Sequence, residues 1–453
     1  MTKTLAKKLN SSPVARWTVL IVVAFTMFCG YFITDVMAPL MDLLKDEFQW
    51  TATEYGIFNM AYGWLNVFLF MLIIGGIILD KLGMRITGSL SCTLMIIGCA
   101  LKYYAVSQPF AGEIFGLKTQ VFIACIGFAI FALGIEMTGI TVTKVIVRWF
   151  KGYEMALAMG IQVAVARLGT ALAMSTTIPL AKSFGSLSAP ILFGLGALCI
   201  GLIAFLVFCV MDRKLDASAV NIEEVKEEPF RIKDIGFIVK NKGFWLIAIL
   251  CVLFYSAVFP FLKYATSLMI NKYNVAPELA GNIPAILPFG TILLTPLFGG
   301  IYDRKGKGAT IMIIGATILI AVHAMFAMPF LNIWWFAASL MILLGIGFSL
   351  VPSAMWPSVP KIIPENKLGT AYSMIFWVQN IGLSLVPLLI GWVLDKYCTV
   401  VTDGVSRYDY TIPMIIFMCF GTLAFVTAWL LKIEDKKKGY GLEKPNMKKA
   451  NKD

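Results

Sequence analysis

The sequence predicts an all-α membrane protein in which twelve transmembrane helices form two related six-helix bundles. Composition is the first of three observations behind this prediction. Of the 453 residues, 59% are hydrophobic and only 14% are charged, whereas a soluble domain has about 25% charged residues. Second, apolar runs near the ~20 residues that cross a bilayer as a helix recur along the whole chain. Third, a charged, glycine-rich motif occurs twice.

The apolar runs predict twelve spans whose lengths suit tilted helices. They cover residues 15–40, 54–79, 86–106, 119–147, 153–181, 188–211, 242–270, 279–301, 309–330, 332–359, 367–394 and 410–432. We therefore expect an N-terminal bundle (1–211), a cytoplasmic linker (212–241), a C-terminal bundle (242–432) and a basic cytoplasmic tail (433–453). The linker carries an acidic cluster, namely Glu223, Glu224, Glu227 and Glu228.

The 38 lysine and arginine residues are divided unevenly between the two sides of the membrane. With the N-terminus in the cytoplasm, three lie within spans (Lys144, Arg167 and Lys263) and 28 lie on the cytoplasmic side. The opposite side receives seven: Lys45, Lys102, Lys118, Lys182, Lys272, Lys396 and Arg407. This excess predicts that both termini are cytoplasmic. The net charge of +12 thus indicates membrane topology and contact with anionic lipid, not binding to nucleic acid.

The repeated motif follows the second span and the eighth. Its first copy contains Gly76, Asp80, Lys81, Gly83 and Arg85, and its second contains Gly299, Asp303, Arg304 and Gly306. The two aspartates are 223 positions apart, which indicates two six-helix halves related by a repeat. Glycine permits a tight turn, aspartate can accept from a helix N-terminus, and the basic residues can bind carboxylate or lipid phosphate. We expect both copies to form a cytoplasmic gating motif.

Four ionisable residues lie deep inside predicted spans: Asp35, Glu136, Arg167 and Lys263. A charge at a helix centre costs about 2.5–3.5 kcal/mol even on the lowest scales, so these side chains should face a wet cavity or one another. Their charges sum to zero, which suits mutual pairing and a zwitterionic ligand equally. For Glu136 and Arg167 we favour a substrate or gating role over a structural ion pair, whereas for Asp35 and Lys263 both roles stay open.

Polar and aromatic residues in the same spans extend the candidate binding site: Tyr31, Tyr62, Gln162, Trp356, Trp377, Gln379 and Asn380. A single aromatic residue of this kind more often packs or anchors at the interface than contacts a ligand. The sequence contains no Walker loop, zinc motif or nucleophile elbow. We therefore expect no cofactor, no metal, no ATP-driven pump and no enzyme.

The repeated motif is the signature pattern of the major facilitator superfamily, which the chain resembles over its whole length. Further stretches resemble the lysosomal dipeptide transporter branch: Tyr31-Phe32 with Asp35, Tyr62 with Trp64, Gly134 to Glu136, Trp149-Phe150-Lys151-Gly152, Gly160-x-Gln162, Ala166-Arg167-x-Gly169, Ala257-Val258-Phe259-Pro260-Phe261, Trp356-Pro357, Leu368-Gly369-Thr370-Ala371-Tyr372 and Gln379-Asn380-x-Gly382-Leu383.

The resemblance implies two bundles around a central cavity that opens alternately to each side. In that branch a glutamate in span 4 and an arginine in span 5 hold the two ends of a dipeptide, and the matching positions are Glu136 and Arg167. A lysine at the span-7 position of Lys263 departs from the pattern, which leaves its role and the side-chain preference open.

Three functions follow from these residues. The leading hypothesis is transport of dipeptides or similar small zwitterions by alternating access. The resemblance implies uniport, although Asp35 or Glu136 could instead carry a proton. The second is transport of a small anion, such as nitrate or an organic acid, bound by Arg167 and Lys263; Glu136 would repel it unless protonated. The third is a membrane sensor that transports nothing.

The relatives implied by the resemblance are lysosomal and work with an accessory glycosylated subunit. The single Asn-x-Ser/Thr sequon of this chain is Asn10-Ser11-Ser12, in the N-terminal segment that is predicted to be cytoplasmic. We therefore favour a bacterial inner membrane, with the lysosomal membrane as the alternative, and a monomer in the lipid bilayer without that subunit.

Overall fold

The computed structural model describes residues 9–218, 232–364, 367–402 and 405–446, which are almost entirely helical. The N-terminal half contains η1 (Leu9–Ser11), α1 (Pro13–Asp35), η2 (Ala38–Leu40), α2 (Met41–Phe48), α3 (Ala52–Met60), α4 (Tyr62–Asn66), α5 (Met71–Ser107), β1 (Glu113–Ile114), β2 (Leu117–Lys118), α6 (Thr119–Phe150), α7 (Met155–Phe184) and α8 (Ala189–Ser218). The acidic cluster of the predicted linker lies outside the described residues.

The C-terminal half contains α9 (Ile232–Ile238), α10 (Lys242–Asn271), α11 (Pro277–Ala280), α12 (Asn282–Lys305), α13 (Gly308–Ala327), α14 (Trp334–Ile362), α15 (Leu368–Tyr397), β3 (Thr399–Thr402), β4 (Val405–Tyr408) and α16 (Thr411–Lys438). The strands form two antiparallel hairpins, β1–β2 and β3–β4. The prediction of an all-α fold is thus confirmed apart from these short loop hairpins.

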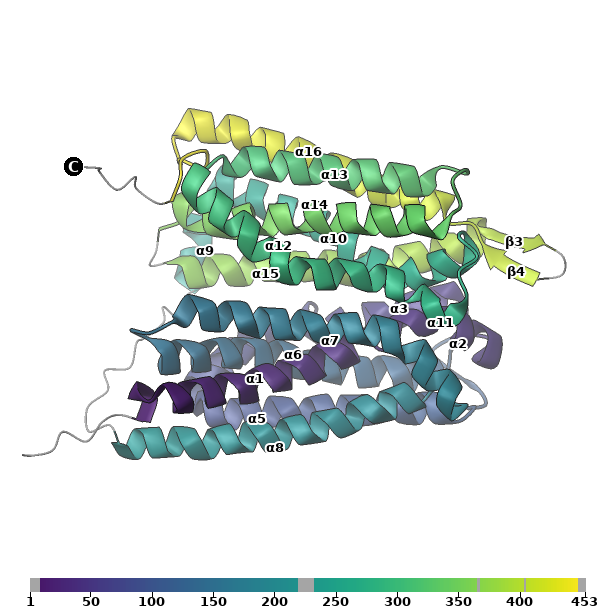
Figure 1. Cartoon of the computed structure of the whole chain (residues 1–453), viewed down its shortest axis with the longest axis horizontal. Helices are drawn as coiled ribbons and strands as arrows, with labels where there is room; N and C mark the ends of the chain where they lie inside the picture. The colour runs from purple at the N-terminus through teal and green to yellow at the C-terminus, as the bar shows by residue number, and fades with distance from the viewer. Residues whose placement is uncertain (1–8, 219–231, 365–366, 403–404, 447–453) are drawn as a thin grey trace, which may run out of the picture.

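The helices form two bundles that lie side by side, the N-terminal half below the C-terminal half in Figure 1. Within the first, α1 packs on α7 and α8, and α5 packs on α6; within the second, α10 packs on α15 and α16, and α13 packs on α14 and α16. The bundles meet along α3 with α15 and along α7 with α12. The start of α1 and the end of α16 lie at the same end of the molecule (Figure 1).

In the described part of the chain, eleven helices are long and apolar enough to cross a membrane. The difference from the predicted twelve lies in the second span, because 54–79 is divided among α3, α4 and the start of α5. Asn59 and Asn66 each donate to the carbonyl four residues before, and Phe70 has a left-handed backbone (φ 54°). Side-chain bonds of this kind compete with regular helix. Twelve spans and cytoplasmic termini stay predictions.

Lys102, which the sequence analysis assigned to the side opposite the termini, is fully buried inside α5. Its Nζ donates to the carbonyl of Ile33 at 3.0 Å and lies 4.7 and 4.5 Å from the ring centroids of Phe128 and Phe131. These contacts replace water around the ammonium group. The assignment was wrong, but the remaining excess of 28 to six basic residues still predicts the same topology.

Several polar contacts between the bundles lie on the hairpin side, opposite the termini. The Asp395 carboxylate accepts from the backbone N–H groups of Ala52 and Thr53, at 2.9 and 2.6 Å, and so caps the N-terminus of α3 from the other bundle. Lys45 donates to the carbonyl of Ser406 at 3.0 Å on the same side. The molecule is therefore in a state closed on the hairpin side.

Backbone contact at Gly56 generates the first prediction. A Cβ atom there would lie 2.7 Å from the Pro387 carbonyl oxygen of α15. Gly56→Ala should disfavour the state closed on the hairpin side by about 1–3 kcal/mol, or roughly 5- to 150-fold in population. The measurement is double electron–electron resonance between spin labels at Glu47 and Val401, in a protein whose exposed Cys199 and Cys419 are replaced. The variant should show a larger fraction of long distances between the two labels than the unmodified Gly56 protein.

Gly196→Ala in α8 is the matched control, because a Cβ atom there meets nothing within 4 Å. An unchanged distance distribution in Gly56→Ala would contradict the argument, as would an equal change in the control.

Candidate functional site

A cavity of about 460 Å³ lies between the two bundles and is lined by residues from both. Nine of the eleven binding residues predicted from the sequence line it: Tyr31, Asp35, Tyr62, Glu136, Arg167, Lys263, Trp356, Gln379 and Asn380. The two others do not. Trp377 donates to the carbonyl of Val67 at 3.0 Å and stacks on Phe70, and Gln162 lies on α7 outside the lining.

Glu136 projects from α6 into this cavity and is held by one hydrogen bond. The Tyr62 hydroxyl, at the start of α4, donates to its Oε1 at 2.6 Å. Among the described residues, no lysine, arginine or histidine nitrogen lies within 4 Å of the Glu136 carboxylate. The carboxylate therefore has a hydrogen-bond donor but no cationic partner.

Arg167 projects from α7 and is surrounded by aromatic rings. Its guanidinium carbon lies 5.9 Å from the ring centroid of Tyr31, 5.2 Å from that of Phe259 and 5.7 Å from that of Phe348. Ring faces attract a cation without using its N–H donors. No carboxylate of the described chain forms an ion pair with Arg167. Hence Arg167 and Glu136 share one cavity but do not pair with each other.

Asp35 and Lys263, in contrast, form an ion pair between the bundles. The Lys263 Nζ on α10 lies 2.6 Å from Asp35 Oδ1, and it also donates to the carbonyl of Thr34 at 3.0 Å. Thr170 on α7 donates to Asp35 Oδ2 at 2.8 Å. Both side chains are mostly buried, with 13% and 16% of their surface exposed.

This pair also satisfies the end of a helix. Because α1 ends at Asp35, its last carbonyls have no partner within the helix. Lys263 binds the carbonyl of Thr34 from the C-terminal bundle, and Lys102 binds that of Ile33 from the N-terminal bundle. Positive charge at a helix C-terminus is also favourable to the helix dipole. The end of α1 is thus held by one lysine from each half.

Several cavity residues were missed by the sequence analysis. Thr170 could have been found, because it lies three residues after Arg167 and so on the same side of a helix. Phe259 of the cavity, and Phe348, which lies outside the lining but contacts Arg167, were not selected as binding residues, since an apolar residue in an apolar span is unremarkable. Tyr255 accepts from the Trp356 Nε1 at 3.1 Å. The buried Asn380 Oδ1 has no hydrogen-bond partner among the described residues, so it can accept from a ligand.

The two copies of the glycine-rich motif make different contacts. In the first, Asp80 accepts from Lys144 of α6 at 2.8 Å, and Arg85 donates to Asp216 at 2.6 Å. In the second, Asp303 accepts from Asn446 of the C-terminal segment at 2.8 Å. Among the described residues, neither aspartate side chain accepts a hydrogen bond from a helix N-terminus. The remaining members have simpler surroundings: Gly83 and Gly306 adopt positive φ at the turns, Gly76 and Gly299 face open space, and Lys81 and Arg304 are exposed.

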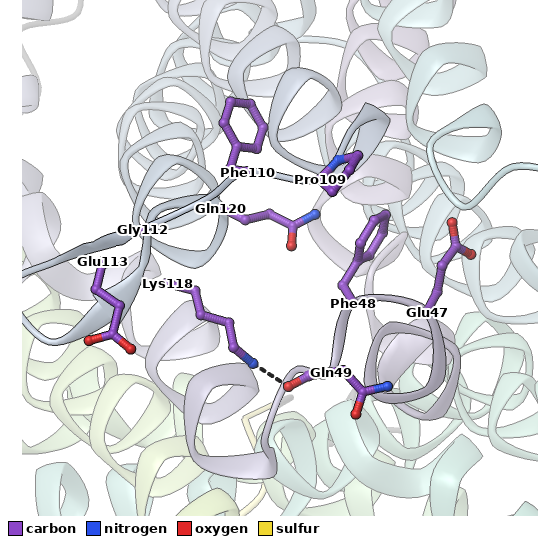
Figure 2. A pocket seen from close by; sticks show the side chains of 9 residues that line it. All are labelled: Glu47, Phe48, Gln49, Pro109, Phe110, Gly112, Glu113, Lys118 and Gln120. Carbon is purple, nitrogen blue, oxygen red and sulfur yellow. Dashed lines mark hydrogen bonds between the residues drawn. The ribbon is translucent and has the colours of Figure 1, made fainter.

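A second pocket, of about 430 Å³, lies on the hairpin side of the N-terminal bundle and is lined by residues of the 47–49 and 109–120 segments (Figure 2). Lys118 donates to the carbonyl of Gln49 at its edge. None of the residues predicted for the binding site or the gating motif lines this pocket.

Two bundles of membrane-spanning helices around a polar cavity, joined by contacts on the hairpin side, form the architecture of a membrane transporter. The chain belongs to the Major Facilitator Superfamily, whose family model matches residues 20–387. It is therefore an integral, multi-pass membrane transporter and not an enzyme.

Similar proteins and structures agree with this class. The chain is 29% identical over 391 residues to the lysosomal dipeptide transporter MFSD1 of Mus musculus, covering 84% of this chain and 80% of that protein. The match to MFSD1 of Danio rerio is also 29%, covering 84% and 81%.

Two solved structures share the fold. The nucleoside transporter NupG has a TM-score of 0.68 at 15% identity, covering 92% of this chain and 99% of that one. A bacterial homolog to the human lysosomal transporter Spinster, inward-facing and occupied, has a TM-score of 0.68 at 14% identity, covering 94% and 98%.

The ion pair between the bundles generates the second prediction. Asp35→Asn and Lys263→Met should each lower the melting temperature, because each leaves a mostly buried charge without its partner. The double variant should lose less than the sum of the two, with a coupling energy of about 0.5–3 kcal/mol. Thermal unfolding in detergent measures the cycle.

Lys182 and Glu278 provide the comparison, because they also pair between the bundles but both side chains are more than 40% exposed. Their cycle should give little or no coupling. Equal coupling in the two cycles would refute the importance assigned to burial.

Proposed function

We propose that this protein transports dipeptides, or similar small zwitterions, by alternating access. One observation carries the proposal: Glu136 and Arg167 face the same cavity with opposite charges, and neither forms an ion pair within the described chain. A zwitterion supplies the missing partner of each. Its ammonium group would bind Glu136 and its carboxylate would bind Arg167.

The chemistry of the lining supports this assignment. A guanidinium group can donate two parallel hydrogen bonds to one carboxylate. The ring contacts of Arg167 use none of its N–H donors, and no carboxylate of the described residues pairs with it. The Asn380 Oδ1 can accept from a peptide N–H. A cavity of about 460 Å³ is within the usual range for small-molecule sites. The similarity to proteins named lysosomal dipeptide transporters agrees with this substrate class.

A small anion is the second candidate substrate, favoured by the absence of a carboxylate partner for Arg167. The second cation that the sequence analysis assigned to such an anion is Lys263, whose ammonium group already binds Asp35 and the carbonyl of Thr34. Glu136 would also repel an anion in the same cavity. If Glu136→Gln increases anion uptake and leaves dipeptide uptake unchanged, the anion is the substrate.

Alternating access in this proposal is a rocking of one bundle against the other. The state closed on the hairpin side faces the cytoplasm if the predicted topology holds. We propose a uniporter that acts as a monomer in a bacterial inner membrane, with the lysosomal membrane as the alternative. Any flux of substrate in the assay below would exclude the hypothesis of a sensor that transports nothing.

The third prediction concerns the two charged residues. Purified protein in liposomes should take up a labelled neutral dipeptide, and Arg167→Ala and Glu136→Gln should each reduce uptake roughly 10- to 100-fold, the effect of losing one charged hydrogen-bonding group. Gln162→Ala is the control, because this residue lies on the same helix as Arg167 but outside the lining. No uptake by the unmodified protein, or full uptake by Arg167→Ala, would rule out the assignment.

The fourth prediction concerns energy coupling. A uniporter equilibrates its substrate, so a pH gradient that is acidic outside should not drive the internal dipeptide above its external concentration. Internal concentration at steady state, measured with and without the gradient, decides the question. Accumulation above the external concentration would show instead that a proton moves with the substrate.

A further inference from the structure

The Asp35–Lys263 pair lies in the cavity but is not needed to hold the two ends of a zwitterion. Both residues line the same space as Glu136 and Arg167. Glu136 and Arg167 are unpaired and available to a ligand, whereas Asp35 and Lys263 are paired with each other at 2.6 Å. The cavity thus holds two open ionic positions and one that the protein itself fills.

The filled position has the chemistry of a binding site for a basic side chain. Its acceptors are a carboxylate and a main-chain carbonyl, supplied by Asp35 and Thr34 at the end of α1. Thr170 donates to the other carboxylate oxygen and fixes its orientation. The occupant is the ammonium group of Lys263, which reaches across from α10. A lysine side chain of a substrate would present the same group to the same acceptors.

This position is within reach of a substrate bound at Arg167. Tyr31, whose ring contacts the Arg167 guanidinium, lies one helical turn before Asp35, which is about 6 Å along the axis of α1. A dipeptide that binds Arg167 through its carboxylate could therefore direct a side chain toward Asp35. In the unmodified protein that side chain meets a neutralised carboxylate and the positive charge of Lys263.

We propose that Lys263 occupies a subsite for a basic side chain and thereby restricts the substrate to zwitterions with uncharged side chains. This inference rests on the proposed function and adds a substrate class to it. A basic substrate has to displace Lys263 from a mostly buried pair or leave its own charge unpaired, and both are unfavourable. Selectivity would then have two sources: Lys263 disfavours a basic side chain, and Glu136 and Arg167 bind the two ends of the zwitterion.

Lys263→Ala should open the subsite. The variant leaves the Asp35 carboxylate without a cation, so alanyl-lysine can supply the missing ammonium group and alanyl-alanine cannot. In liposomes, the unmodified protein should take up alanyl-alanine at least about 10-fold more efficiently than alanyl-lysine, and Lys263→Ala should raise the ratio of alanyl-lysine to alanyl-alanine uptake about 10-fold or more. Alanyl-lysine should also raise the melting temperature of Lys263→Ala more than that of the unmodified protein.

The comparison of two substrates in the same vesicles removes effects of the variant on protein amount and on the balance of conformations. The double variant Asp35→Asn/Lys263→Ala lacks the acceptor carboxylate. Its ratio of alanyl-lysine to alanyl-alanine uptake should therefore not rise above that of the unmodified protein. Alanyl-glutamate should gain nothing in Lys263→Ala, because its side chain would face the unpaired carboxylate. Lys182→Ala removes another lysine that pairs between the bundles but lies outside the cavity, and it should leave all ratios unchanged.

Three outcomes would overturn the inference: equal uptake of alanyl-lysine and alanyl-alanine by the unmodified protein, an unchanged ratio in Lys263→Ala, or the same gain in the double variant. The first requires no variant, so the inference is testable even if Lys263→Ala does not fold. If the unmodified protein takes up none of the three dipeptides, the proposed function itself fails. If it takes up alanyl-alanine while the ratios do not move, this inference alone fails.

Discussion

The free energy of holding charge away from water determines how the centre of this protein is built. Each of the charged side chains there would cost several kcal/mol if left alone in the membrane interior. The chain meets this cost in four ways: Asp35 and Lys263 pair, Arg167 lies among three rings, Lys102 binds two rings and a carbonyl, and Glu136 accepts from a tyrosine. The partners of the Asp35–Lys263 pair and of Lys102 lie within the protein, whereas Arg167 leaves donors and Glu136 leaves an acceptor for a ligand.

The sequence was sufficient to find the residues at which this cost arises. A charge in the middle of an apolar run is unusual whichever way the helix is rotated about its axis. It was less reliable for their neighbours, whose position depends on helix rotation. Gln162 and Arg167 are five residues apart, which at 3.6 residues per turn places them about 140° apart around α7. One therefore lines the cavity and the other does not.

Other features could not be predicted, since they depend on contacts between segments far apart in the chain. The rings of Phe259 and Phe348 matter only because α10 and α14 approach α7 across the gap between the bundles. Lys102 was assigned to the side opposite the termini because nothing in its own segment shows that α1 ends beside it and leaves a carbonyl to bind. The break in the second span is accompanied by side-chain bonds of Asn59 and Asn66 that a hydropathy pattern does not register.

The partners of each charge also determine what a rocking movement would do to it. Lys102 binds groups of its own bundle, so it would stay dry and paired throughout. Lys263 and Asp35 would separate, but the water that enters between the bundles would hydrate both as they part, which reduces the cost of breaking the pair. Arg167 would lose Phe259 and Phe348 and keep only the ring of Tyr31. A bound carboxylate would then compensate the guanidinium group at the moment its aromatic contacts are lost, so substrate binding would favour the movement that carries the substrate across.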